Sequence, residues 1–227
     1  MDRDFTAPHP KHTRHSSTPL LLNPHIPFWR NRVLQLLIAV YAAFWIYMAL
    51  SPTNRMQWLM ENMLPVAAVL ALTFTYRKYR LSTLSYLLLF AFFCLHTYAA
   101  HYTYQSTPFD VWLKSAFHTE RSYFDRVVHF AFGLLWAYPV RELLVRKANL
   151  RGVWSYAVSV SIVFGCSALF EILEMVVALI GGQAGEDYMG MQGDLFDSQK
   201  DMALGMAGAV VAMGLLGWIN KHRNTAR

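Results

Sequence analysis

Residues 153–180 read VWSYAVSVSIVFGCSALFEILEMVVALI, a run of 28 residues whose only charged side chains are Glu171 and Glu174. The hydrocarbon core of a bilayer is about 30 Å thick, so about 20 apolar residues in a helix are enough to cross it. The run lacks the alternation of apolar and polar residues that a membrane barrel strand needs, whereas a helix satisfies every backbone polar group internally. This stretch therefore predicts a transmembrane helix.

Five further runs of the same character are found at residues 33–50, 58–76, 81–100, 127–145 and 202–220. Hydrophobic residues make up 55% of the 227 residues and charged residues only 15%, whereas an ordinary soluble domain carries about 25% charged residues. This composition argues against a soluble enzyme and, for most of the chain, against disorder. The sequence predicts an all-α membrane bundle with six transmembrane helices. Residues 29–220 form the membrane domain, between a disordered tail at 1–28 and a short tail at 221–227.

The basic residues indicate how the bundle is oriented. All but five of the 20 Lys and Arg residues fall in segments that share a side with both termini, and the exceptions are Arg55, Lys114, Arg121, Arg126 and Lys200. Because cytoplasmic loops of membrane proteins are enriched in Lys and Arg, we expect both termini to be cytoplasmic. This bias accounts for the net charge of +6, so we expect the lipid bilayer, and no nucleic acid, as a partner.

The long outer connection, residues 101–126, contains a helix-start pattern. Thr107-Pro108 followed by Asp110 places a proline at the first helical position and an acid in the first turn. Apolar residues then recur at helical spacing, at Phe109, Trp112, Leu113, Ala116 and Phe117. We expect a short helix lying on the outer leaflet; the alternative is a loop packed over the bundle.

The two glutamates of the opening stretch are the most informative polar residues. Glu171 and Glu174 are three apart and share one helix face. A charge within the bilayer costs about 2.5–3.5 kcal/mol even on the most lenient scale, and two neighbouring carboxylates need a cation, a proton or a donor between them. Other polar groups predicted at a similar depth, on the outer side, are His96, Asp125, His129, Asp197 and Asp201.

These groups predict a polar site that opens toward the outside. As candidate catalytic groups we take Glu171, Glu174, Asp125, His129, Asp197 and Asp201. Carboxylates with imidazole suit a divalent metal that activates water, for which the candidate ligands are Glu171, Glu174, His129 and Asp201. Two alternatives stay open: Asp197 and Asp201 stabilise a helix N-terminus, or Asp125 and His129 form an ion pair at a helix end. The ligand is an unidentified small molecule or lipid-linked compound, and the oligomeric state is not determined.

Three motifs carry a resemblance to a known family. They are Phe124-Asp125-Arg126-Val-Val-His129-Phe130, then Phe170-Glu171-Ile-Leu-Glu174, then Gly193-Asp194-Leu-Phe-Asp197-Ser-Gln-Lys-Asp201-Met202. In this order they resemble the YjdF-type family of uncharacterised bacterial inner-membrane proteins, and the last is distantly similar to VanZ-like membrane proteins. Met175 and Lys200 stand where the resemblance leads us to expect tryptophan. The resemblance implies a multi-pass protein of the cell inner membrane, and no particular reaction.

Three functional hypotheses follow. The first is a membrane enzyme acting on a lipid-linked or envelope substrate at the outer leaflet. The second is a transporter for a small solute or cation, and the third is a non-catalytic envelope factor whose acids are structural. The acids gather on one side and the spans show no internal repeat, whereas many transporters are built from repeats around a site at the midplane. The enzyme is therefore the first hypothesis.

Overall fold

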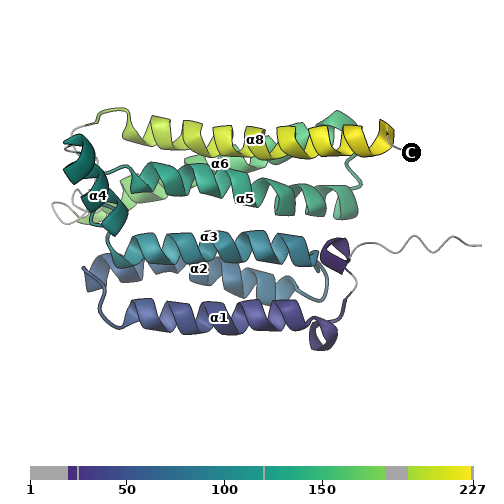
Figure 1. Ribbon diagram of the computed structural model, residues 1–227, viewed down its shortest axis with the longest axis horizontal. Coiled ribbons are helices and arrows are strands. Elements are labelled where there is room, and N and C mark those ends of the chain that lie inside the picture. Colours follow the sequence, from purple (N-terminus) through teal and green to yellow (C-terminus); the bar gives the residue numbers. More distant parts are fainter. Residues whose placement is uncertain (1–19, 25, 120, 182–193, 226–227) are drawn as a thin grey trace, which may run out of the picture.

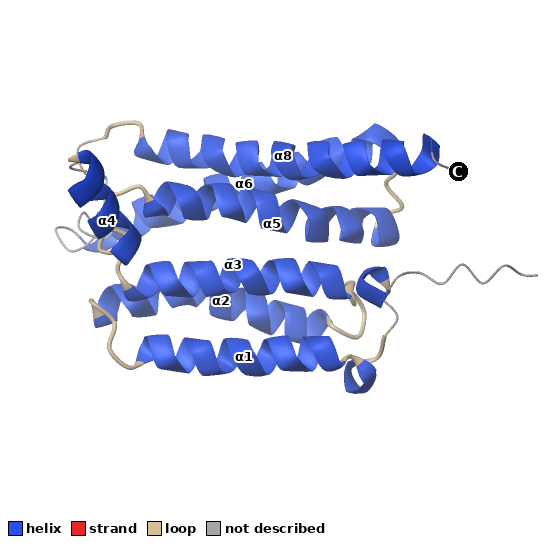
Figure 2. Ribbon diagram, viewed as in Figure 1, coloured by secondary structure: helices blue, strands red, loops and turns tan. Residues whose placement is uncertain are grey.

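The computed structural model describes residues 20–24, 26–119, 121–181 and 194–225, and within these ranges every regular element is helical (Figure 2). Six helices are long and apolar enough to cross a membrane. They are α1 (Arg32–Ala49), α2 (Arg55–Thr75), α3 (Thr83–His101), α5 (Phe124–Lys147), α6 (Gly152–Gly181) and α8 (Asp197–Thr225). This confirms the all-α fold with six spans that the sequence predicts.

The long helices form two groups that meet at α3 and α5 (Figure 1). In the first group α1 and α2 pack against α3, and in the second α6 and α8 pack against α5. The first described residues and the C-terminus lie at one end of the bundle, which we call the terminal end, and the short helix α4 (Pro108–Phe117) lies across the other end, the α4 end (Figure 1). The predicted cytoplasmic location of both termini stays a prediction.

A buried glutamate joins the two groups at the terminal end. Ser82, the N-cap of α3, donates from its backbone N–H (2.8 Å) and its hydroxyl (2.7 Å) to the carboxylate of Glu142 on α5. The Ser85 hydroxyl donates to the same carboxylate, and Arg146 pairs with it at 2.6 Å. Because the carboxylate receives several donors and a cation, its burial is compensated, and the start of α3 is tied to the end of α5.

The helix predicted after Thr107 is α4. The Thr107 side chain accepts from the Asp110 N–H at 3.1 Å, and Pro108 is the first helical residue. The Asp110 carboxylate is fully buried and accepts from the backbone N–H groups of Tyr123 and Phe124. It thereby fixes α4 to the start of α5. The apolar side chains of Val111, Trp112 and Phe117 are exposed, as a helix on a leaflet requires, although its position in the membrane stays a prediction.

Small residues let α5, α6 and α8 pack closely. A Cβ atom at Gly133 of α5 would overlap the backbone of Gly205 on α8, and one at Gly208 would overlap the backbone of Phe130. Such contacts between backbones are typical of helices that associate within lipid. The inward face of α6 repeats every four residues, with buried side chains at Ser155, Ser159, Val163, Ser167 and Glu171. The glutamate therefore continues a row of small residues that faces the bundle.

The tails are only partly described. Most of the predicted disordered tail at 1–28 lies outside the described residues, and its described part includes short 3-10 helices at Leu20–Leu22 and Phe28–Arg30. The helix α8 continues past the predicted end of the last span at residue 220 and reaches Thr225.

Candidate metal and acid site

The candidate site lies where α5, α6 and α8 meet near the α4 end. The glycine contact between α5 and α8 sets its geometry: Gly133 and Gly205 touch, and His129 and Asp201 precede them by four residues each. One helical turn spans 3.6 residues, so both polar side chains lie one turn beyond the closest approach of the two helices. The glycines thus bring His129 and Asp201 together without being polar themselves.

His129 is the centre of the cluster. Its Nε2 atom lies 3.5 Å from Oδ1 of Asp125 and 3.4 Å from Oε1 of Glu171. Asp125, His129 and Asp201 each place one potential ligand atom so that all three atoms lie within 4.8 Å of one another. His129, Glu171 and Asp201 are buried, whereas the Asp125 side chain is 40% exposed. These four residues form the cluster: Asp125 lies at its mouth, and His129, Glu171 and Asp201 lie in its interior.

The interior acids are incompletely satisfied. The Oδ1 atom of Asp201 is buried and makes no hydrogen bond to any part of the chain that the structure describes. Glu171 shares a side-chain hydrogen bond with Ser198 at the start of α8. Burying a polar atom without a partner costs about 1–3 kcal/mol, and more for a charged group. The unsatisfied oxygen of Asp201 is therefore available to a ligand.

The structure places the other predicted residues around this cluster. Glu174 is half-buried, and its charged neighbours include Asp125, Glu171 and Asp201. Neither Glu174 nor Glu171, both proposed as metal ligands from the sequence, belongs to the compact group of ligand atoms, which Asp125 completes with His129 and Asp201. His96 is buried on α3 with Nε2 donating to the Glu61 carbonyl oxygen and Nδ1 accepting from the Tyr104 hydroxyl. Both ring nitrogens of His96 are therefore occupied.

An ion network covers the cluster on the α4 side. Asp194 accepts from Arg121 at 2.9 Å, from Arg126 at 2.8 Å and from Lys200 at 2.6 Å. The Lys200 hydrogen bond, with a backbone hydrogen bond from Phe196 and the pairing to Arg126, lowers the pKa of Asp194 to about 2.

Asp197 belongs to the same network, since it pairs with Arg121 and, at 3.4 Å, with Arg126. Asp197 is thus paired with two cations, whereas Asp201, one turn further along α8, lies beside Asp125 and His129. In the sequence, Arg121 and Arg126 stand out as exceptions to the charge bias, and Arg126 also lies in the first family motif, but neither is among the candidate site residues. Their contacts with Asp194 and Asp197 depend on two chain segments about 70 residues apart.

Glu61 on α2 is a further buried acid. Its side chain is 5% exposed, and its Oε2 atom has no hydrogen-bond partner among the described residues. Its charged neighbour is Asp125 on α5. Glu61 is not among the candidate site residues that the sequence predicts. Its place inside the predicted span 58–76 was the available signal, because an ionisable residue within a span is by default a candidate functional residue.

The comparisons with known proteins agree with this architecture. The family described as "Predicted membrane protein (DUF2238)" matches residues 33–222. The chain belongs to this family. The match includes part or all of each of the six spans and every residue of the candidate site.

A curated relative is the inner membrane protein YjdF of Escherichia coli strain K12. It is 34% identical over 169 residues, which are 74% of this chain and 81% of the relative. The inner-membrane location of this relative agrees with the location that the sequence predicts for the present DUF2238 chain, and the family resemblance seen in the sequence is confirmed. No solved structure matches the chain.

Proposed function

We propose that this protein is a membrane-embedded, metal-dependent hydrolase that cleaves a phosphate ester of a lipid-linked or envelope molecule. The observation that carries the proposal is the convergence of Asp125, His129 and Asp201 within 4.8 Å, beside an arginine pair, at one end of the bundle.

The cation part of the proposal rests on the ligand chemistry. Carboxylate and imidazole groups are ligands that Zn²⁺ and Mn²⁺ accept. Asp201 offers a buried oxygen that no described residue satisfies, and Asp125 is exposed enough to receive a cation from solvent. Glu171 lies 3.4 Å from His129, so it would be the group that takes a proton from a water molecule at this site.

The anion part rests on Arg126. Its Nε atom is buried without a hydrogen-bond partner in the described part of the chain, while its other end pairs with Asp194 and Asp197. Arg126 also interacts electrostatically with Asp201. A guanidinium group recognises phosphate through several directed N–H donors. An unsatisfied donor beside an unsatisfied acceptor fits a ligand that brings a cation and an anion together, such as a metal-bound phosphate.

The proposed reaction is ordinary hydrolysis. Asp125, His129 and Asp201 would hold the cation, and Glu171 would take a proton from the attacking water molecule as the water oxygen bonds to phosphorus. The bond between phosphorus and the ester oxygen breaks, and the departing oxygen takes the proton from Glu171. A bound cation contributes by lowering the pKa of water and by stabilising the developing negative charge.

The packing beneath the cluster favours an enzyme over a carrier. Immediately toward the terminal end, the backbones of Gly133 and Gly205 touch. Beyond them Val163, Ala209 and Met213 form a buried apolar cluster. A solute that entered between α5 and α8 would meet this closed packing within about one helical turn of the site, whereas many transporters hold their substrate near the midplane between repeats. An enzyme needs access from one side only.

Metal analysis of the detergent-purified protein tests the proposal. Elemental mass spectrometry after incubation with Mn²⁺ or Zn²⁺ and desalting should find about one ion per chain, and His129→Gln or Asp201→Asn should lose it. His222→Gln is the matched control, because His222 is exposed at the far end of α8. Hydrolysis of short-chain phosphatidic acid and of a polyprenyl phosphate should then require the metal. Equal metal content in the wild type and the His129→Gln variant would contradict the proposal. Ion flux in proteoliposomes without hydrolysis would favour a carrier.

A further inference from the structure

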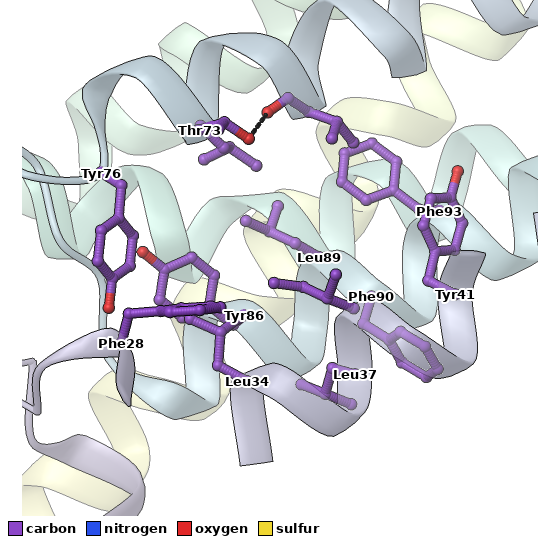
Figure 3. Close-up of a pocket in the computed structure, with 13 residues that line it drawn as sticks. Phe28, Leu34, Leu37, Tyr41, Thr73, Tyr76, Tyr86, Leu89, Phe90 and Phe93 are labelled. Atoms are coloured by element: carbon purple, nitrogen blue, oxygen red, sulfur yellow. Dashed lines mark hydrogen bonds between the residues drawn. The ribbon is translucent and has the colours of Figure 1, made fainter. Parts of the chain in front are cut away.

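An apolar groove lies in the terminal half of the bundle, far from the candidate site. Figure 3 shows its lining by side chains of α1, α2 and α3, among them Leu34, Leu37, Thr73, Leu89, Phe90 and Phe93. Its volume is about 480 Å³, which falls within the range of ligand pockets, about 300–1,000 Å³.

The groove exists because α1 and α2 meet at only one end. Near the α4 end the Trp45 indole donates to Asn62 at 2.6 Å, and its ring packs against Trp58. Over their whole length the two helices pack on α3 and scarcely on each other, and toward the terminal end the groove lies between them. The two helices therefore form a wedge whose floor is α3.

The walls of the groove suit hydrocarbon. The lining hydroxyl of Tyr41 is paired with Thr97, that of Thr73 donates to the Val69 carbonyl oxygen, and that of Tyr86 accepts from the Leu81 N–H. These hydroxyls are satisfied within the chain and leave the apolar carbon atoms to face the groove. A polar ligand would find few partners there, whereas an acyl chain needs none.

The mouth of the groove at the terminal end is polar and basic. The Tyr76 hydroxyl is buried and has no hydrogen-bond partner among the described residues, and the same holds for Nε of Arg80. The Arg80 guanidinium lies 5.3 Å from the centre of the Tyr76 ring, which itself lines the groove (Figure 3). Arg77 and Lys78 follow directly and are exposed. Among the described residues, Glu142 is the acid at this end of the bundle. It is already paired with Arg146, so it does not neutralise the basic residues at the mouth.

We propose that the groove binds an anionic phospholipid of the leaflet on the terminal side, with one acyl chain between α1 and α2. Its phosphate group lies against Arg77, Lys78 and Arg80 and accepts a hydrogen bond from the Tyr76 hydroxyl. Basic pockets between transmembrane helices favour anionic headgroups, and this mouth combines positive charge with unsatisfied donors directly beside an apolar groove. The proposal is independent of the hydrolase, whose site lies at the other end of the bundle.

Native mass spectrometry tests the proposal with two probes, phosphatidylglycerol and phosphatidylcholine of the same acyl length, added together to the purified protein. We expect one phosphatidylglycerol molecule to be retained preferentially. In the variant Arg77→Gln/Lys78→Gln/Arg80→Gln the preference should fall by about fivefold for each charge removed, roughly 100-fold in all. The control Lys221→Gln/Arg223→Gln removes two exposed charges at the same end, on α8, and should keep the preference.

Because Arg80 packs on Tyr76, the triple variant could lose the preference for phosphatidylglycerol by misfolding. A second variant therefore tests the groove with the basic residues unchanged. Leu37→Trp enlarges a side chain in the groove and leaves the basic residues in place. It should abolish retention of the lipid while the protein stays monodisperse. Equal retention of the two lipids by the wild type would overturn the proposal, and so would a Leu37→Trp variant that holds phosphatidylglycerol as well as the wild type does.

Discussion

The glycine contact between α5 and α8 gives the sharpest test of how packing creates the site. In Gly133→Ala the new methyl group would overlap the carbonyl oxygen of Gly205 and lie 2.7 Å from the backbone nitrogen of Ala209. Alanine gains about 1 kcal/mol over glycine in helix propensity. Overpacking costs about 1–3 kcal/mol, and the upper value applies because the obstacles are backbone atoms that cannot rotate away. We expect a net loss of about 2 kcal/mol in the free energy of unfolding.

The matched control is Gly165→Ala on α6, where a methyl group meets nothing within 4 Å. There only the propensity gain applies, so stability should rise by about 0.5–1 kcal/mol. The two variants should then differ by roughly 3 kcal/mol. At about 2–4 °C per kcal/mol for a chain of this size, their melting temperatures should differ by about 6–12 °C.

Fluorescence-detected size-exclusion chromatography after heating in detergent measures this difference, and metal titration of the same samples measures the site. Separating the helices moves His129 away from Asp201, so Gly133→Ala should bind Mn²⁺ or Zn²⁺ at least tenfold more weakly than Gly165→Ala. If Gly133→Ala melts at or above the temperature of Gly165→Ala, the helices do not pack as described. Lower stability with unchanged metal affinity would show that the glycine contact does not position the ligands.

Three further outcomes are expected. Glu142→Gln replaces an acceptor of several hydrogen bonds and the partner of Arg146; it should destabilise the protein by about 3 kcal/mol in a thermal melt without changing metal binding. The pKa of Asp194 is lowered from 3.8 to about 2, so its pairing contributes to stability fully above about pH 4 and this contribution is lost as the pH falls toward 2. Lys200→Met should move that loss to higher pH in acid unfolding followed by fluorescence. An unchanged profile would argue against the pairing. Reporter fusions after Tyr79 should be cytoplasmic and fusions after Ser115 periplasmic, and one inverted stable fusion would refute the predicted orientation.

Local patterns in the sequence determined the helices. Uncharged runs of about 20 residues are decisive because a bilayer offers the backbone no hydrogen bonds, so each run has to be helical whatever its neighbours do. The predicted spans and α1, α2, α3, α5, α6 and α8 accordingly agree within a few residues at most ends. The start of α4 was equally readable, since Thr107, Pro108 and Asp110 act within one turn.

The site was readable only in part. The depth of a polar residue follows from its distance to a helix end, so the acids and His129 could be assigned to one side of the bundle. Their partners could not be assigned, because α5 and α8 lie about 50 residues apart in the sequence and pack by shape. Thus Asp125, and neither Glu171 nor Glu174, completes the compact group with His129 and Asp201, and Asp197 pairs with Arg121 and Arg126.

The sequence by itself determined that this chain crosses the membrane six times and carries its acids near one end, because hydrophobic length and charge act locally. Only the tertiary structure decided which of those acids meet. That outcome depends on where glycine backbones let α5 and α8 touch, a contact between residues more than 70 positions apart. Glu61 lies near Asp125 for the same reason, because α2 packs on α3 and α3 packs on α5. No local sequence pattern predicts that packing.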